Sequence, residues 1–233
     1  MTDFVAPSAG LLARLGRLAL GRGAALAALA VAAAGLLGFA AVLQMTENGP
    51  HRFDEAVMLA LRRPGMPDQP VGPPWLSLAL REVTALGSIP VLGLLTLIAF
   101  GYLALDGRWR AVALLALSLP GGLLLNTLLK GVFDRPRPDL VARLMEVQTP
   151  SFPSGHAMLS AIGFLTLGTL LAAGARRRHQ AYILTTAVLL TLLVGGSRVW
   201  LGVHWPTDVL AGWCLGAAWA MGCWLLLRQR AAR

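Results

Sequence analysis

Six stretches of 17 to 21 residues in this chain contain no charged side chain and are predominantly apolar. A helix needs about 20 such residues to cross roughly 30 Å of hydrocarbon, and the stretches lack the alternation of a membrane barrel strand. Only 13% of the 233 residues are charged, against about 25% in a soluble domain. The sequence therefore predicts an all-α, polytopic membrane protein with six transmembrane helices in a bundle, forming a single domain over residues 1–233. The predicted spans are 23–43, 88–105, 111–129, 157–175, 181–197 and 209–227.

The charged residues are distributed unevenly between the two sides of the predicted bundle. Six spans place both termini on one side, where eleven of the 20 basic residues and two of the 11 acidic residues lie. The positive-inside rule assigns this side to the cytoplasm. The formal charge of +9 thus reflects topology and does not indicate a nucleic-acid partner. We expect a multi-pass protein of the inner (plasma) membrane, with both termini cytoplasmic and the lipid bilayer as its environment.

The segment between the first two spans, residues 44–87, mixes prolines with charges. Residues 53–62 and 75–86 each show a helix-like alternation of apolar and polar positions. We expect two short interfacial helices over the outer face of the bundle. Nothing in this segment identifies a chemistry.

Ionisable residues concentrate in three motifs, which are KGVFDRPRPD (130–139), PSGH (153–156) and SRVWLGVHWPTD (197–208). On the predicted topology, the first motif follows the third span, the second opens the fourth span, and the third joins the last two spans. All three therefore lie at the outer face. Because the topology was assigned without these motifs, their convergence predicts one site, facing the periplasm or the exterior.

Several residues in these motifs suit an anionic ligand. Lys130, Arg137 and Arg198 are cations without an obvious acidic partner, and Arg and Lys both bind phosphate oxygens. Ser154 can cap the helix that follows it, whose amide groups would then face an anion. Gly155 allows the backbone to approach a ligand closely. Taken singly, Lys130 and Arg198 could instead be basic ends of spans that reach the interface.

Two histidines and one carboxylate supply candidate reactive groups. Asp208 follows His204 by four residues, so its carboxylate can orient the imidazole and leave the other ring nitrogen as a nucleophile. His156 can donate a proton to a leaving oxygen. His204 and Asp208 could alternatively form a structural pair, or the three residues could bind a metal. Three nearby cations disfavour a metal ion, so we predict neither a metal nor another cofactor.

The three motifs, Lys-x6-Arg-Pro, Pro-Ser-Gly-His and Ser-Arg-x5-His-x3-Asp, resemble the signature of the type 2 phosphatidic acid phosphatase superfamily. This superfamily also contains vanadium haloperoxidases and glucose 6-phosphatase. The resemblance implies metal-independent hydrolysis of a phosphate ester or anhydride through a phosphohistidine. It assigns His204 as nucleophile, Asp208 as its orienting group and His156 as general acid. It also assigns phosphate binding to the remaining motif residues, Lys130, Arg137, Ser154, Gly155 and Arg198.

The compact six-span layout is similar to bacterial lipid phosphatases within this superfamily. The resemblance implies a lipid (di)phosphate substrate, such as undecaprenyl pyrophosphate, phosphatidylglycerol phosphate, phosphatidic acid or a lipid A phosphate. Arg135 could contact a second phosphate, or it could pair with Asp134 or Asp139. A lipid phosphotransferase would use the same residues. An anionic lipid transporter and a degenerate lipid-binding scaffold are the alternatives that are not enzymes.

Overall fold

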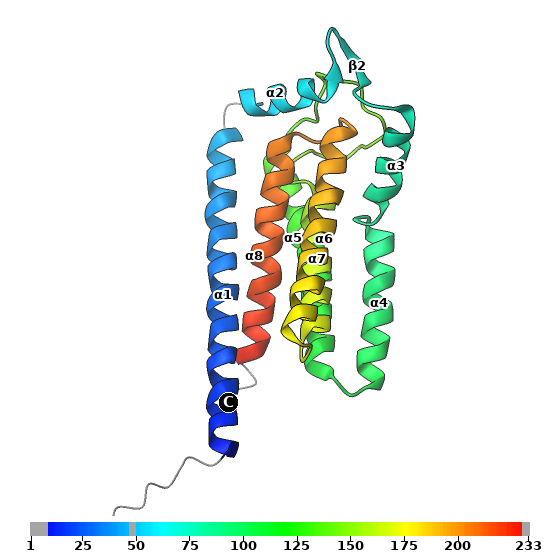
Figure 1. Ribbon diagram of the computed structural model, residues 1–233. Coiled ribbons are helices and arrows are strands. Elements are labelled where there is room, and N and C mark those ends of the chain that lie inside the picture. Colours follow the sequence, from blue (N-terminus) through cyan, green and yellow to red (C-terminus); the bar gives the residue numbers. More distant parts are fainter. Residues whose placement is uncertain (1–8, 47–49, 230–233) are drawn as a thin grey trace, which may run out of the picture.

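The structure, a computed structural model, describes residues 9–46 and 50–229, with side chains described for 22–46 and 50–228. Six long helices run side by side (Figure 1). The prediction of an all-α membrane bundle is confirmed, because each predicted span falls on one of these helices. The helices are α1 (Ala9–Thr46), α4 (Ile89–Leu105), α5 (Trp109–Phe133), α6 (Gly155–Ala172), α7 (Arg177–Trp200) and α8 (Pro206–Gln229).

Five of these helices are long and apolar enough to span a membrane unaided. The sixth, α4, has 17 residues and qualifies together with α3 (Pro74–Ala85), from which it is bent by 43°. The bend is at Gly87 and Ser88, and the Ser88 hydroxyl caps α4 by accepting from the amide of Val91. A Cβ at Gly87 would lie 2.4 Å from Val194 of α7, so glycine permits the close approach of this bend to α7.

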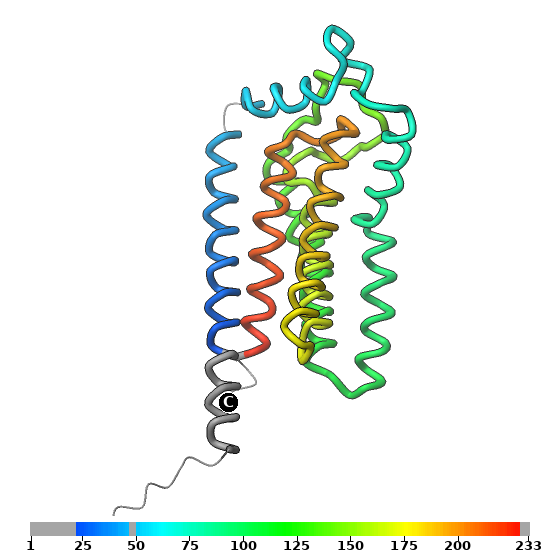
Figure 2. The backbone as a smooth tube through the Cα atoms, viewed as in Figure 1, coloured from blue at the N-terminus to red at the C-terminus, as the bar shows by residue number. Residues whose placement is uncertain are grey.

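One end of the bundle is covered by the segment between α1 and α4, and we call it the capped end. Here α2 (Arg52–Ala60) lies across the bundle, and α3 lies above α4 (Figure 1). Between them, β1 (Arg62–Arg63) and β2 (Met66–Pro70) form an antiparallel pair. The two amphipathic helices were predicted, whereas this hairpin was not, because strands this short show no detectable periodicity. Figure 2 shows the connection from α5 to α6 returning at the same end.

Buried Arg62 fixes the hairpin to the rest of the capped end. Its guanidinium donates to the carbonyl oxygens of Leu61 and Trp200, at 3.2 and 3.1 Å. Trp200 is the last residue of α7, where helix carbonyls lack partners in the helix itself. Arg62 therefore joins the hairpin to the end of the helix that carries Arg198.

Helix α6 lies at the centre of the bundle and packs against α5, α7 and α8, while α1 packs along α8. Outer helices expose large apolar side chains, such as Leu37 on α1 and Leu97 on α4, at 72% and 69% of their surface. Such exposure fits helices that face lipid.

The opposite end of the bundle holds the connections from α4 to α5 and from α6 to α7. Helix α6 stops three residues short of the predicted span end, because Gly174 has a positive φ that ends the helical path. The charge count that assigned this end to the cytoplasm includes residues outside the described side chains. These residues are Asp3, Arg14, Arg17, Arg230 and Arg233.

Candidate active site

The three sequence motifs meet around one cavity of about 380 Å³ at the capped end. Its remaining walls come from the bend between α3 and α4, from one face of α5, from Val147 and Thr149 in the connection between α5 and α6, and from Leu159 of α6. Two of the predicted site residues, Ser154 and Asp208, lie outside its lining. Those that line it are Lys130, Arg137, Gly155, His156, Arg198 and His204.

His204 lies in the short connection between α7 and α8 and is 2% exposed. Its Nδ1 is 3.4 Å from Oδ2 of Asp208, one turn along the chain. Its Nε2 is 3.1 Å from a guanidinium nitrogen of Arg137. Since a guanidinium only donates hydrogen bonds, Nε2 accepts here and the ring proton belongs on Nδ1, toward the carboxylate. The lone pair of Nε2 therefore points to the Arg137 side of the ring.

Burial is the main reason that the pKa of His204 lies well below its usual value of 6.5. The charges of Arg137, Arg198 and Lys130 lower that pKa further. His204 is therefore a neutral imidazole at physiological pH, which is the protonation state a nucleophile requires.

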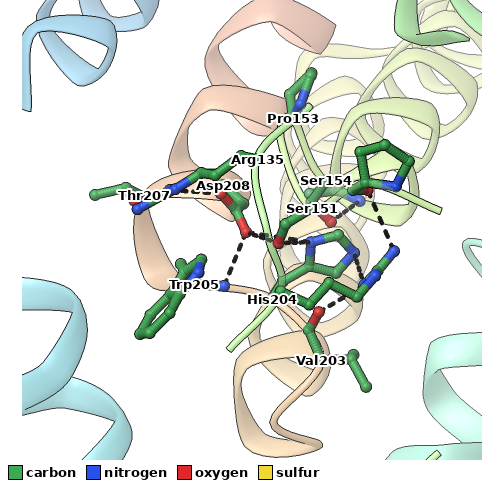
Figure 3. A network of polar contacts seen from close by, with 12 residues as sticks. Arg135, Ser151, Pro153, Ser154, Val203, His204, Trp205, Thr207 and Asp208 are labelled. Carbon is green, nitrogen blue, oxygen red and sulfur yellow. Dashed lines mark hydrogen bonds and ion pairs between the residues drawn. The ribbon is translucent and has the colours of Figure 1, made fainter. Parts of the chain in front are cut away.

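Asp208 is fully buried behind His204 and is held by several donors (Figure 3). Oδ2 accepts from the amide of Trp205 at 2.9 Å and from the hydroxyl of Ser151. Oδ1 accepts from Arg135 at 2.6 Å. These bonds fix the carboxylate in the orientation that faces the imidazole.

Three cations line the cavity without forming a salt bridge to any carboxylate in the described part of the chain. Arg137 donates to the carbonyl of Thr149 at 2.7 Å, and burial lowers its pKa to about 10, so it stays charged. Lys130 donates to the carbonyl of Pro150. Arg198, 1% exposed, donates to the hydroxyl of Thr84 at 3.2 Å. Because these three cations are bonded to neutral groups and not to carboxylates, their charge remains available to bind an anion.

The N-terminus of α6 reaches the cavity through Gly155 and His156. Ser154 is the N-cap as predicted, and its hydroxyl accepts from the amide of Ala157. Its own amide donates to the backbone carbonyl of Asp208 at 3.0 Å, so that N–H is not free for a ligand. A Cβ at Gly155 would approach Oδ1 of Asn126 to 3.1 Å, so a small residue is favoured here by packing against α5, and the close approach to a ligand stays a prediction.

Arg135 pairs with carboxylates, but with neither of the two that its position suggests. The chain leaves α5 through a left-handed conformation at Asp134, and Arg135 then lies in the interior at 9% exposure. It bonds to Asp54 at 3.0 Å and to Asp208 at 2.6 Å. Because it does not line the cavity, Arg135 lends no support to a second phosphate subsite.

Asp54 of α2 is the residue that sequence reasoning missed. It is fully buried and accepts from the amide and the hydroxyl of Thr207, at 2.8 and 2.7 Å, in addition to Arg135. The only sequence signal is its place four residues before buried Met58, on the inward face of an amphipathic helix. Its partners lie 81 and 153 residues away and could not be inferred from local pattern.

A metal site of ordinary composition is not evident in the described ranges, which contain no group of three or more His, Cys, Asp or Glu side chains able to hold an ion. The donor set at the cavity is two imidazoles and three cations, a combination suited to a phosphoryl group.

Comparisons with known proteins agree with the motifs. A family model described as the PAP2 superfamily matches residues 111–232. Phosphatidylglycerophosphatase B of Bacillus subtilis is 36% identical over 146 residues, which cover 61% of this chain and 71% of that protein. Decaprenylphosphoryl-5-phosphoribose phosphatase of Mycobacterium tuberculosis is 33% identical over 181 residues, covering 74% and 89%.

The fold has a solved counterpart. The crystal structure of a transmembrane PAP2-type phosphatidylglycerolphosphate phosphatase from Bacillus subtilis superposes with a TM-score of 0.68 at 28% identity. The match covers 88% of this chain and 96% of that structure. The resemblance inferred from the three motifs is thereby confirmed, and the chain is a multi-pass membrane protein that belongs to the PAP2 superfamily.

Proposed function

We propose that this protein hydrolyses a lipid phosphate at the outer leaflet, without a metal ion, through a phosphohistidine at His204. As a PAP2 member whose relatives are named as lipid phosphatases, the chain is a lipid phosphatase. The observation that supports the mechanism is the placement of His204 between Asp208 and Arg137, with its Nε2 lone pair on the side of the cations.

In the first step, Nε2 of His204 attacks phosphorus while the bond to the lipid oxygen breaks, and His156 protonates that oxygen. The positive charge that develops on the His204 ring is stabilised by Asp208. Lys130, Arg137 and Arg198 neutralise the equatorial phosphoryl oxygens, so positioning and electrostatics provide most of the rate enhancement.

In the second step, water attacks phosphorus and the bond between nitrogen and phosphorus breaks. His156 accepts the proton from this water, and inorganic phosphate leaves. A monoester substrate yields a lipid alcohol, whereas a diphosphate yields a lipid monophosphate.

A phosphate monoester is the substrate class that we favour. Three cations line the cavity, enough for one phosphoryl group, and Arg135 is occupied by Asp54 and Asp208. Phosphatidylglycerol phosphate is the first candidate, because the B. subtilis relative and the structural counterpart are both named for it.

The test is phosphate release by the purified protein in excess EDTA from phosphatidylglycerol phosphate, phosphatidic acid, undecaprenyl pyrophosphate and a lipid A phosphate. We expect turnover of a monoester, with loss of at least about 10³-fold in His204→Ala and His156→Ala. His179→Ala is the matched control, since His179 is exposed at the far end of the bundle and should leave turnover unchanged. Full activity in His204→Ala would contradict the mechanism.

Trapping the intermediate separates hydrolysis by this route from direct attack of water. With ³²P-labelled substrate and an alkaline quench, wild-type protein should carry alkali-stable, acid-labile label that is absent from His204→Ala. Vanadate should inhibit wild-type turnover. Transfer of label to an added lipid alcohol would favour the phosphotransferase alternative over hydrolysis.

A further inference from the structure

A second cavity, of about 540 Å³, lies at the end of the bundle opposite to the candidate active site. It is formed by the connection from α4 to α5, the start of α5 and the last turns of α6 and α8. None of the residues that line it belongs to the three sequence motifs. Its lining combines basic side chains, Arg108, Arg110 and Arg228, with aromatic rings, Trp109 and Trp224.

The described residues that line this cavity carry positive charge and no negative charge. No Asp or Glu is among its lining residues, and Arg228 has no salt bridge in the described part of the chain. The Nη1 atom of Arg228 is buried without a hydrogen-bond partner among described residues, while its guanidinium carbon lies 5.1 Å from the centre of the Trp224 ring. Arg228 as a whole is half-buried, but a buried donor without an acceptor is costly, so this geometry favours an acceptor such as an anion in the cavity.

The walls of the cavity are apolar. Leu114 is 4% exposed, and Leu170 and Leu227 are partly buried beside it. A small soluble anion would leave these side chains in contact with water. A molecule with a negative head and an apolar tail satisfies both the arginines and the leucines, and Trp109, 66% exposed at the rim, suits the interfacial depth of such a head group.

We propose that this cavity binds the head group and upper acyl chains of an anionic phospholipid in the leaflet opposite to the catalytic one. Basic pockets between transmembrane helices on the cytoplasmic side of a membrane are known to bind anionic lipid head groups. The lipid would not be a substrate, since no histidine lines this cavity. The proposal does not depend on the proposed function.

The test uses the full chain in phosphatidylcholine nanodiscs with increasing fractions of dibrominated phosphatidylglycerol, and dibrominated phosphatidylcholine in parallel. Bromine quenches nearby tryptophans, and two of the seven tryptophans line this cavity. The candidate active-site cavity is lined by none. Subtracting the signal of Trp224→Phe isolates the response of Trp224.

We expect dibrominated phosphatidylglycerol to reach half-maximal quenching of Trp224 at a mole fraction at least about fivefold lower than dibrominated phosphatidylcholine does. Fivefold is about the preference that one arginine provides for an anionic lipid. Arg228→Gln should lower this preference by a similar factor, and Arg110→Gln tests the same site if the first variant does not fold. Arg177→Gln is the matched control, because Arg177 is exposed at the same end but does not line the cavity.

Equal quenching by the two brominated lipids would overturn the proposal. So would an equal loss of preference in Arg228→Gln and Arg177→Gln, which would indicate attraction to general surface charge. Inorganic phosphate is added as a separate probe. If it displaces phosphatidylglycerol from the wild type at millimolar concentration, the site takes a soluble anion and the assignment to a lipid is wrong.

Discussion

At the residue scale, Asp208, the carboxylate behind the candidate nucleophile, belongs to a larger buried network of charged and polar side chains. Arg135 bonds to both Asp208 and Asp54, and Thr207 bonds to Asp54 from the first turn of α8. Removing one partner of a buried pair leaves an uncompensated charge and costs about 3–5 kcal/mol, whereas the intact pair holds its members in one geometry. We therefore propose that Asp54 is a positioning residue, which acts on His204 through its contacts with Arg135 and Thr207.

The substitution Asp54→Asn should lower kcat by roughly ten- to hundredfold, the range seen when an orienting partner is lost. KM should stay within about twofold, because Asp54 does not line the cavity. The measurement is steady-state kinetics together with the phosphoenzyme burst, which counts active sites. A purely structural role would reduce the burst and leave kcat per active site unchanged. Asp68→Asn, which alters an exposed carboxylate of β2, is the control.

His204 should also make stability depend on pH. The folded protein resists protonation of His204, whereas the unfolded chain takes up this proton near pH 6.5, so lowering the pH favours unfolding. The free energy of unfolding should therefore fall steadily as the pH is lowered from neutral through the range in which the unfolded chain is protonated. The free energy of unfolding is measured in detergent at a series of pH values, with tryptophan fluorescence as the signal. His204→Asn should remove this part of the slope, and an unchanged slope would contradict a neutral buried imidazole.

At the scale of elements, the close approach of α6 and α8 sets the distance between the motifs that these helices carry. A Cβ at Gly212 would lie 2.8 Å from the backbone oxygen of Ser154, and one at Gly216 would lie 2.6 Å from that of Met158. Both contacts are with backbone, so a larger residue would push the helices apart. Because α6 starts at the cavity and α8 starts beside His204, such a movement would widen the site.

We therefore expect Gly212→Ala to destabilise the fold by about 1–3 kcal/mol, the usual cost of overpacking, and to reduce turnover. Gly222→Ala in the same helix is the matched control, because a Cβ there would meet nothing within 4 Å. Unfolding in a denaturing detergent compares the two variants. Equal stability of both would show that the helices adapt to an added methyl group.

For the whole molecule, the sequence predicted the spans and the meeting of three motifs, since long apolar runs and fixed spacing are local patterns. It did not predict the hairpin, whose strands are too short for periodicity, or the role of Asp54, which depends on partners far along the chain. For the same reason, the sequence suggests only a second phosphate or a neighbouring aspartate as the partner of Arg135, whereas Arg135 pairs across the fold with Asp54. Local pattern specified the helices, and tertiary contacts specified the support behind the site.

The orientation of the whole molecule in the membrane, with the capped end facing the periplasm or exterior, is also a prediction. Arg63→Cys places a thiol in the exposed hairpin at the capped end, and Arg177→Cys places one at the opposite end. A membrane-impermeant maleimide should label position 63 in intact cells and position 177 only after permeabilisation. The natural cysteines lie within α8, so the unsubstituted chain gives the background. The reverse pattern would place the catalytic cavity in the cytoplasm.

The link from Asp54 to Arg135 has a consequence for building chimeras between PAP2 relatives. The segment that follows the first span cannot be exchanged as a neutral spacer, because one of its carboxylates neutralises an arginine of the first catalytic motif. We expect a hybrid of this chain that keeps Arg135 but loses Asp54, or the reverse, to lose activity, because one member of the buried pair would then be unpaired. In a chimera, the segment that carries Asp54 and the motif that carries Arg135 should therefore be exchanged together, although they are far apart in the sequence.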